Sequence, residues 1–173
     1  EKSELNPQTN YGLIKLLTEE LYRQFSRIYD LNITILRLSN IFGPNKKAGY
    51  ISHLINSSVF NHQKISAYNN GNQYRDVLFI DDAIDGIIKS LKKPLKGFNI
   101  FNISSGTKFS INEIIKEIEK ISNQKLNIEY TNEIPDESCI WADNSKAKNV
   151  LNFSPKTSLH DGIETTINYL KTH

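Results

Sequence analysis

The feature that most constrains the fold is the succession of two different apolar patterns along the chain. Between residues 10 and 30, apolar side chains recur at helical spacing, at Leu16, Leu17, Leu21, Phe25 and Ile28. Residues 32–38 then form a short β-branched run without strict alternation, which is typical of a strand covered on both faces. A helix followed by a strand of this kind predicts an α/β fold with a parallel sheet.

The later segments continue the alternation. Strands are expected at residues 64–68, 77–80, 98–103 and 126–130, and helices at 50–60, 83–91, 111–121, 145–151 and 159–170. Capping residues support several helix starts: Asp81 or Asp82, Ser110 with Glu113, Asp143 or Asn144, and Ser158 with Asp161. Residues 131–140 are expected to form a polar loop.

Composition narrows the classes of protein that need to be considered. With 173 residues, of which 38% are hydrophobic, the chain can bury one sizeable core, or one domain plus part of another. Its net charge of +2 comes from scattered residues without a basic run, which argues against nucleic-acid binding. The four histidines show no metal-ligand spacing.

The cellular setting follows from what the sequence contains and omits. A single cysteine, Cys139, excludes an internal disulfide framework, and no segment resembles a signal peptide or a membrane span. We therefore expect a cytoplasmic protein without membrane contact. Because the chain has no methionine and opens on Glu1, we interpret it as a piece of a longer protein.

The first expected helix carries a pair of side chains with chemical potential. Tyr11 and Lys15 are four residues apart, so they project from one helix face. A lysine ammonium near a phenol favours the phenolate and lowers its pKa, which would give a proton acceptor near neutral pH. Such a pair is more often a half-buried aromatic residue and a solvated amine, so the pair alone does not establish catalysis.

Polar residues at strand ends form a second group of candidates. Ser39 and Asn40 follow the 32–38 strand, where ligands bind in open parallel sheets, although Asn40 could equally fasten loop backbone. Arg75 follows a Gly- and Asn-rich turn and could hold a phosphate by two parallel hydrogen bonds. The structural alternative is an ion pair with Asp76 or Asp81.

Five blocks, taken in order, resemble the carboxyl-terminal half of the extended short-chain dehydrogenase/reductases, the NAD-dependent nucleotide-sugar epimerase/dehydratase family. They are Tyr11 to Lys15, Leu36 to Pro44, Gly71 to Ala83, Phe101 to Gly106, and Trp141 to Ala147. The resemblance implies the last strands and helices of a Rossmann-like parallel sheet plus a small α/β substrate-binding lobe. Residues 1–173 would then be a single partial domain, and the Gly-rich cofactor-binding half would lie before Glu1.

The resemblance implies a role for individual residues. Tyr11 resembles the acid/base that takes a proton from the sugar hydroxyl, and Lys15 resembles the residue that assists it and holds the nicotinamide ribose. Ser39 matches a position beside the nicotinamide. The implied substrate is a nucleotide-diphosphate sugar, with Asn40 and Arg75 at the diphosphate and Tyr68 at the base.

Departures from the family pattern concern the substrate. The loop before Asp143 usually carries an arginine ahead of a Gly-Asp pair, whereas this chain has Asn132-Glu133-Ile134-Pro135-Asp136. Asp136 keeps the acidic position for substrate binding, but Glu133 would repel a diphosphate. Ile14 also replaces a small residue that often precedes the lysine.

The expected activity is epimerisation at C4 of the sugar through hydride transfer to NAD and a keto intermediate, with NADP not excluded. The alternatives within the family are a 4,6-dehydratase or a ketosugar reductase, and the alternative of another class is a non-catalytic nucleotide-binding regulator. We expect this chain alone to be inactive. The resemblance also implies a homodimer formed through the helix from Tyr11 to Asp30.

Overall fold

The computed structural model describes residues 1, 5–46, 48–61, 63–133 and 139–173. Its helices are α1 (Asn10–Tyr29), α2 (Tyr50–Asn56), α3 (Ile80–Lys92), α4 (Ile111–Ser122), α5 (Ser145–Leu151) and α6 (Leu159–Thr172). A π-helical turn, η1 (Ser57–Asn61), continues α2, and a 3₁₀ turn, η2 (Tyr68–Gly71), follows the third strand. These helices confirm the expected positions within a few residues.

The strands are β1 (Ile33–Leu38), β2 (Asn40–Phe42), β3 (Ile65–Ala67), β4 (Tyr74–Arg75), β5 (Val77–Phe79), β6 (Phe98–Ile103), β7 (Phe109–Ser110), β8 (Ile128–Tyr130) and β9 (Cys139–Ile140). Three strand pairs, β1 with β6, β2 with β5, and β3 with β8, are parallel. β4 pairs parallel with β9 and antiparallel with β7. The predicted α/β fold with parallel strands is confirmed.

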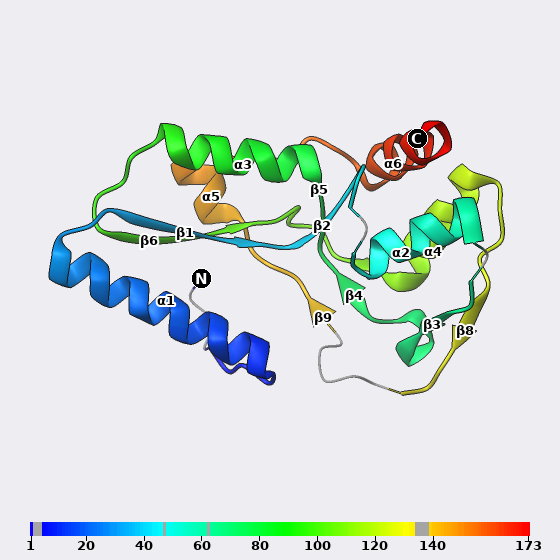
Figure 1. Ribbon diagram of the computed structural model, residues 1–173, viewed down its shortest axis with the longest axis horizontal. Coiled ribbons are helices and arrows are strands. Elements are labelled where there is room, and N and C mark those ends of the chain that lie inside the picture. Colours follow the sequence, from blue (N-terminus) through cyan, green and yellow to red (C-terminus); the bar gives the residue numbers. More distant parts are fainter. Residues whose placement is uncertain (2–4, 47, 62, 134–138) are drawn as a thin grey trace.

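The longest strand pair, β1 with β6, has helices on both faces. α1 lies on one side, and α3 with α5 lies on the other (Figure 1). The pairing runs without a break from Ile33 opposite Phe98 to Leu38 opposite Ile103. Phe101 and Ile103 of β6 pack with Leu151 and Phe153 in a buried cluster beneath α3. This two-sided cover explains why the 32–38 run lacks alternation.

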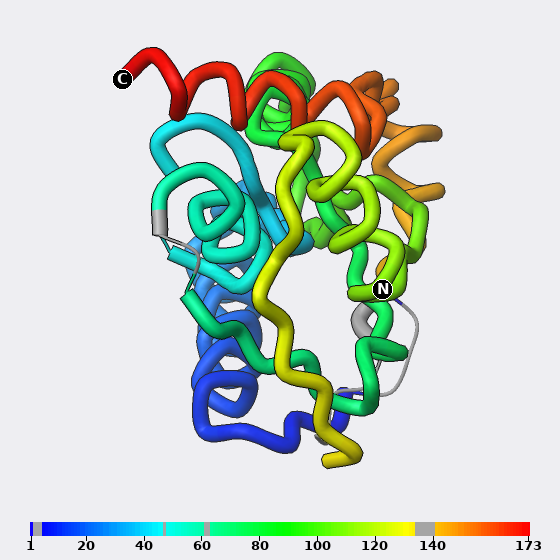
Figure 2. The backbone as a smooth tube through the Cα atoms, turned by 90° about the vertical axis from the view of Figure 1, so that its right-hand side faces the viewer, coloured from blue at the N-terminus to red at the C-terminus, as the bar shows by residue number. Residues whose placement is uncertain are grey.

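A second layer of helices packs around the short strands. α2, α4 and α6 gather at the end of the molecule where β3 and β8 lie side by side (Figures 1 and 2). The isoleucine face of α4, formed by Ile111, Ile114, Ile115 and Ile118, is buried in this core. β2 and β5 connect the two parts, and Gly162 of α6 lies against their aromatic rings, since a Cβ there would be 2.7 Å from Phe42 Cζ.

The start of α3 differs from the prediction. Neither Asp81 nor Asp82 is its N-cap, because β5 runs directly into the helix and Phe79 takes the cap position without a side-chain hydrogen bond. The carboxylate of Asp82 is buried and instead accepts the backbone N–H groups of Lys156 and Thr157, each at 2.9 Å. Asp82 therefore fastens the segment that leads into α6.

Other differences are smaller. The segment expected as a polar loop ends in the short strand β9. Asn144 takes the cap position of α5 without a side-chain cap bond, and Asp143 Oδ1 accepts the Ser145 N–H at 2.8 Å. Among the described residues, no helix has both the length and the apolar character that crossing a bilayer requires.

Candidate functional site

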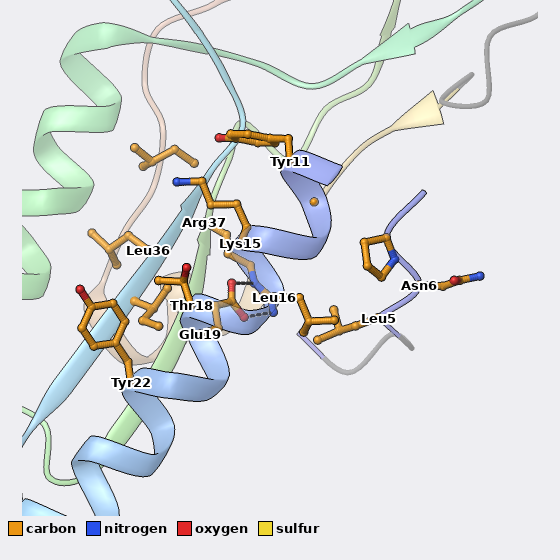
Figure 3. Close-up of a pocket in the computed structure, with 14 residues that line it drawn as sticks. Leu5, Asn6, Tyr11, Lys15, Leu16, Thr18, Glu19, Tyr22, Leu36 and Arg37 are labelled. Atoms are coloured by element: carbon orange, nitrogen blue, oxygen red, sulfur yellow. Dashed lines mark hydrogen bonds and ion pairs between the residues drawn. The ribbon is translucent and has the colours of Figure 1, made fainter. Parts of the chain in front are cut away.

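The first turn of α1 sets the positions of Tyr11 and Lys15. Thr9 caps the helix by accepting the Gly12 N–H at 3.1 Å, so Tyr11 and Lys15 fall on successive turns of one face. Lys15 Nζ lies 5.3 Å from the centroid of the Tyr11 ring, with its side chain beneath the ring (Figure 3). Tyr11 is 71% exposed, so its hydroxyl is open to a ligand.

A cavity of about 700 Å³ lies between α1 and β1, and Tyr11 and Lys15 are among its lining residues. Residues 35–38 of β1 form one wall, and the described residues 5–7 close one end. Arg37 also lines it, but its guanidinium forms two hydrogen bonds with the Glu19 carboxylate (Figure 3). The hydrogen bonds to Glu19 raise the pKa of Arg37. Since Glu19 belongs to α1, Arg37 links β1 to α1.

A second cavity, of about 290 Å³, includes in its lining the residues that directly follow β1. Leu38 lines the first cavity, and the next residue, Ser39, lines the second together with Asn40 and Arg75. The structure therefore brings three of the predicted substrate and cofactor residues together, one residue along the chain from the cavity of Tyr11 and Lys15. Lys46, Tyr50 and Ser52 also line the second cavity.

Charge at the second cavity favours an anion. Within the described part of the chain, its lining includes two cations, Lys46 and Arg75, and no carboxylate. Guanidinium and ammonium groups are the protein's strongest phosphate ligands. Among the described residues, no group of three or more histidine, cysteine or acidic side chains is placed to hold a metal ion.

Ser39 and Asn40 differ in how their side chains are used. The Ser39 hydroxyl oxygen is buried and has no hydrogen-bond partner among the described residues. Asn40 donates through both its backbone N–H and its side-chain Nδ2 to the carbonyl oxygen of Asp76, each at 3.2 Å. Asn40 therefore binds the backbone of Asp76, which agrees with the structural alternative that its side chain holds loop backbone. Ser39, in contrast, has an unused polar group at the position that the resemblance places beside the nicotinamide.

Arg75 lies in β4, between β7 and β9. Its Nη1 donates to the Tyr74 carbonyl oxygen at 2.9 Å, and Nη2 approaches Gln73 Oε1 at 3.5 Å. The Asp76 carboxylate is used elsewhere: it accepts from the N–H and hydroxyl of Ser105 at 2.9 and 2.8 Å and from the Gly106 N–H at 3.2 Å. Asp76 thus holds the turn after β6.

Tyr50 was not predicted as a site residue. Its hydroxyl donates to the Ser66 carbonyl oxygen at 2.9 Å, and burial raises the pKa of Tyr50 to about 12, with smaller effects from Tyr130, Arg75 and Tyr68. In the sequence Tyr50 only begins a helix, and Lys46 lies in an ordinary loop, so no local pattern distinguished either residue.

The remaining predicted residues stand apart. Tyr68 opens η2, is 42% exposed and is not among the lining residues of the two cavities, although it is close enough to influence Tyr50. Asp136 lies outside the described residues.

Comparison with solved structures finds the same fold in UDP-sugar enzymes. A UDP-glucuronic acid 4-epimerase from Bacillus cereus, solved with UDP-glucuronic acid and NAD, superimposes with a TM-score of 0.85 at 32% identity, over 99% of this chain and 58% of that one. A UDP-glucose 4-epimerase from Thermotoga maritima, solved with UDP-glucose, gives 0.87 at 26% identity, over 96% and 55%.

Comparison with curated sequences gives a consistent result. A UDP-glucuronate 4-epimerase from Thermodesulfobacterium geofontis is 34% identical over 167 residues, which cover 95% of this chain and 51% of that protein. The chain spans about half the length of the curated relatives it matches. The model of the NAD dependent epimerase/dehydratase family matches residues 1–104. That match covers more than half of the sequence, and the chain therefore belongs to the NAD dependent epimerase/dehydratase family.

Proposed function

We propose that the protein to which this chain belongs is an NAD-dependent UDP-sugar 4-epimerase, with Tyr11 as the acid/base and Lys15 as its assisting cation. The observation that carries the proposal is the succession at Leu38 and Ser39: Leu38 lines the cavity of Tyr11 and Lys15, and Ser39 lines a second cavity together with Arg75 and Lys46. A UDP-sugar needs both environments: a proton-transfer group at the sugar and cations at the diphosphate. The relatives that act on UDP-glucuronate and UDP-glucose support this substrate class.

Tyr11 would exchange a proton with the sugar hydroxyl at C4. Its exposure leaves the hydroxyl accessible, and the ammonium of Lys15 lies 5.3 Å from the centroid of its ring. Arg75 would hold the diphosphate by its planar fork, and Asn40 would use the polar atoms of its amide that its bond to Asp76 does not occupy.

The residues present fit NAD at its nicotinamide end. The buried hydroxyl of Ser39 lacks a partner in the described structure, and Lys15 can donate to a ribose hydroxyl from the cavity between α1 and β1. When bound, NAD would accept and return the hydride of the sugar carbon, which interconverts the two C4 configurations through a keto sugar. Since this chain spans about half the length of its relatives, we expect it alone not to turn over substrate.

The test uses the full-length protein. It is incubated with UDP-, GDP- and dTDP-sugars, and products are followed by mass and by NMR for wild type, Tyr11→Phe and Tyr29→Phe. We expect conversion of a UDP-sugar at constant mass, lowered about 10²- to 10⁴-fold by Tyr11→Phe. Tyr29→Phe, at the far end of α1, should leave the rate unchanged.

Other outcomes would replace the proposal. Loss of water from the sugar would indicate a dehydratase, and net consumption of reduced cofactor would indicate a ketosugar reductase. Binding of the cofactor without turnover of any sugar would contradict the epimerase and favour a nucleotide-binding regulator.

We also propose that the protein is a homodimer that uses α1. Apolar side chains recur along the helix at Ile14, Leu17, Leu21 and Ile28, and each is between 51% and 63% exposed. An apolar stripe of this kind on a surface helix is a common interface between copies of one chain.

A further inference from the structure

Lys46 lines the same cavity as Arg75, although nothing in its local sequence distinguishes it. We propose that Lys46 is the second cation of the diphosphate site and that Tyr169 of α6 positions it. This inference rests on the proposed function, since it names a further residue that binds the nucleotide sugar.

Charge balance is the first argument. The diphosphate of a nucleotide sugar carries one negative charge on each phosphate, and a single guanidinium neutralises one of them. Lys46 is the other cation in the cavity lining, and among the described residues it forms no ion pair. Its ammonium is therefore available to a ligand, unlike the guanidinium of Arg37 in the neighbouring cavity, which is paired with Glu19.

The backbone that carries Lys46 is held from two sides. Gly43, at a φ of 147°, lies so close to Ile80 that a Cβ would be 2.5 Å from Ile80 Cγ2. Asn45 has a left-handed φ of 62°, and its Oδ1 accepts a hydrogen bond from the Tyr169 hydroxyl at 2.8 Å. The Tyr169 ring in turn stacks on His173 with ring centroids 4.2 Å apart.

This support matters because Lys46 borders two cavities. Besides the cavity of Arg75, it lines a third one of about 670 Å³ that also includes Tyr169. The flexible side chain of Lys46 can extend into either cavity. The position of the loop that carries Lys46 therefore decides which of the two cavities its ammonium occupies. The Tyr169 hydrogen bond to Asn45 fixes that loop, and Tyr169 is thus a positioning residue.

The test measures binding of UDP and of uridine by calorimetry, again with the full-length protein. We expect Lys46→Met to weaken UDP binding about tenfold, to leave uridine binding unchanged and to reduce the dependence of UDP affinity on salt. Lys46→Arg should retain most of the affinity. The control is Lys92→Met, an exposed lysine at the end of α3, which should behave as wild type.

A double-mutant cycle tests the role of Tyr169. Tyr169→Phe should weaken UDP binding about threefold in the wild-type background and not at all in the Lys46→Met background. An equal effect in both backgrounds would show that Tyr169 acts on the fold in general and would overturn its positioning role.

The failures are distinguishable. If wild type does not bind UDP, the proposed function fails. If wild type binds UDP and Lys46→Met binds it equally well, only the assignment of Lys46 fails. An effect confined to UDP-glucuronate, absent with UDP and UDP-glucose, would place the ammonium at a sugar carboxylate and overturn the diphosphate assignment.

Discussion

Two buried polar groups next to the candidate site, the carboxylate of Asp76 and the hydroxyl of Ser39, show opposite hydrogen-bonding states. The Asp76 carboxylate receives three hydrogen bonds from Ser105 and Gly106, whereas the Ser39 hydroxyl has none among the described residues. A satisfied buried carboxylate stabilises the fold, and an unsatisfied hydroxyl costs free energy unless a ligand pairs with it. Asp76 therefore stabilises the fold around the site, whereas the Ser39 hydroxyl is a candidate for a hydrogen bond to a ligand.

Asp76→Ala should destabilise the protein by roughly 2–3 kcal/mol, because the Ser105 and Gly106 N–H groups would lose a charged acceptor in a buried setting. Asp76 has no exposed surface, so water cannot replace the carboxylate fully. Urea unfolding followed by circular dichroism measures the change. Asp81→Ala, an exposed aspartate in the first turn of α3, serves as the control and should cost less than about 1 kcal/mol. Equal losses in both variants would refute the role assigned to Asp76.

Among the structural elements, helix starts show where local signals suffice. The starts of α4 and α6 follow the predicted capping pairs: Ser110 accepts the Glu113 N–H, and Ser158 accepts the Asp161 N–H. At α3 the aspartates do not cap the helix, because Phe79 of β5 takes the N-cap position, and Asp82 instead accepts the N–H groups of residues 156 and 157. A strand also runs directly into α4, since Ser110 ends β7, so the two helices differ in the residue at the cap position: a serine at α4 and a phenylalanine at α3.

The α4 capping box gives a pH-dependent prediction. Hydrogen bonds from the hydroxyl and the N–H of Ser110 lower the pKa of Glu113 from its ordinary value of 4.5. Since the folded-state pKa is the lower one, the stabilisation is present above about pH 4.5 and is lost as the pH falls through the folded-state pKa.

Glu113→Gln should therefore lower the free energy of unfolding at pH 7 by roughly 0.5–1 kcal/mol, and the difference from wild type should shrink at pH 3. Thermal melts at both pH values check this. Glu164→Gln, an exposed glutamate on α6, is the control and should show little effect at either pH. A Glu113→Gln effect that grows toward acid pH would contradict the assignment.

At the scale of the whole molecule, α1 is the least covered helix next to the candidate site. Ser26 is its buried residue, while Ile14, Leu17, Leu21 and Ile28 are largely exposed. This helix also carries Tyr11 and Lys15, the pair proposed to act on the sugar.

If α1 forms the interface of a homodimer, Leu17→Lys with Leu21→Lys should shift the full-length protein from dimer to monomer in sedimentation velocity experiments. Burying two lysines at a self-complementary interface places like charges against each other without partners. Lys substitutions at Ile84 and Ile88, exposed apolar residues of α3, provide the matched control and should leave the dimer intact. A monomeric wild type at micromolar concentration would refute the dimer.

The sequence by itself determined the order of the helices and of the strands β1, β3, β5, β6 and β8, the shared face of Tyr11 and Lys15, and the position of Ser39 directly after β1. These features depend on periodicity and on the rule that ligands sit beyond the ends of parallel strands, and both are local.

Only the tertiary structure decided that Lys46 and Arg75 line one cavity, that Asp82 fastens residues 156–157, and that Tyr169 reaches Asn45 from 124 residues away. Contacts between such distant segments form where the packed core brings them together. That placement depends on the sum of all packing interactions, and no local pattern encodes it.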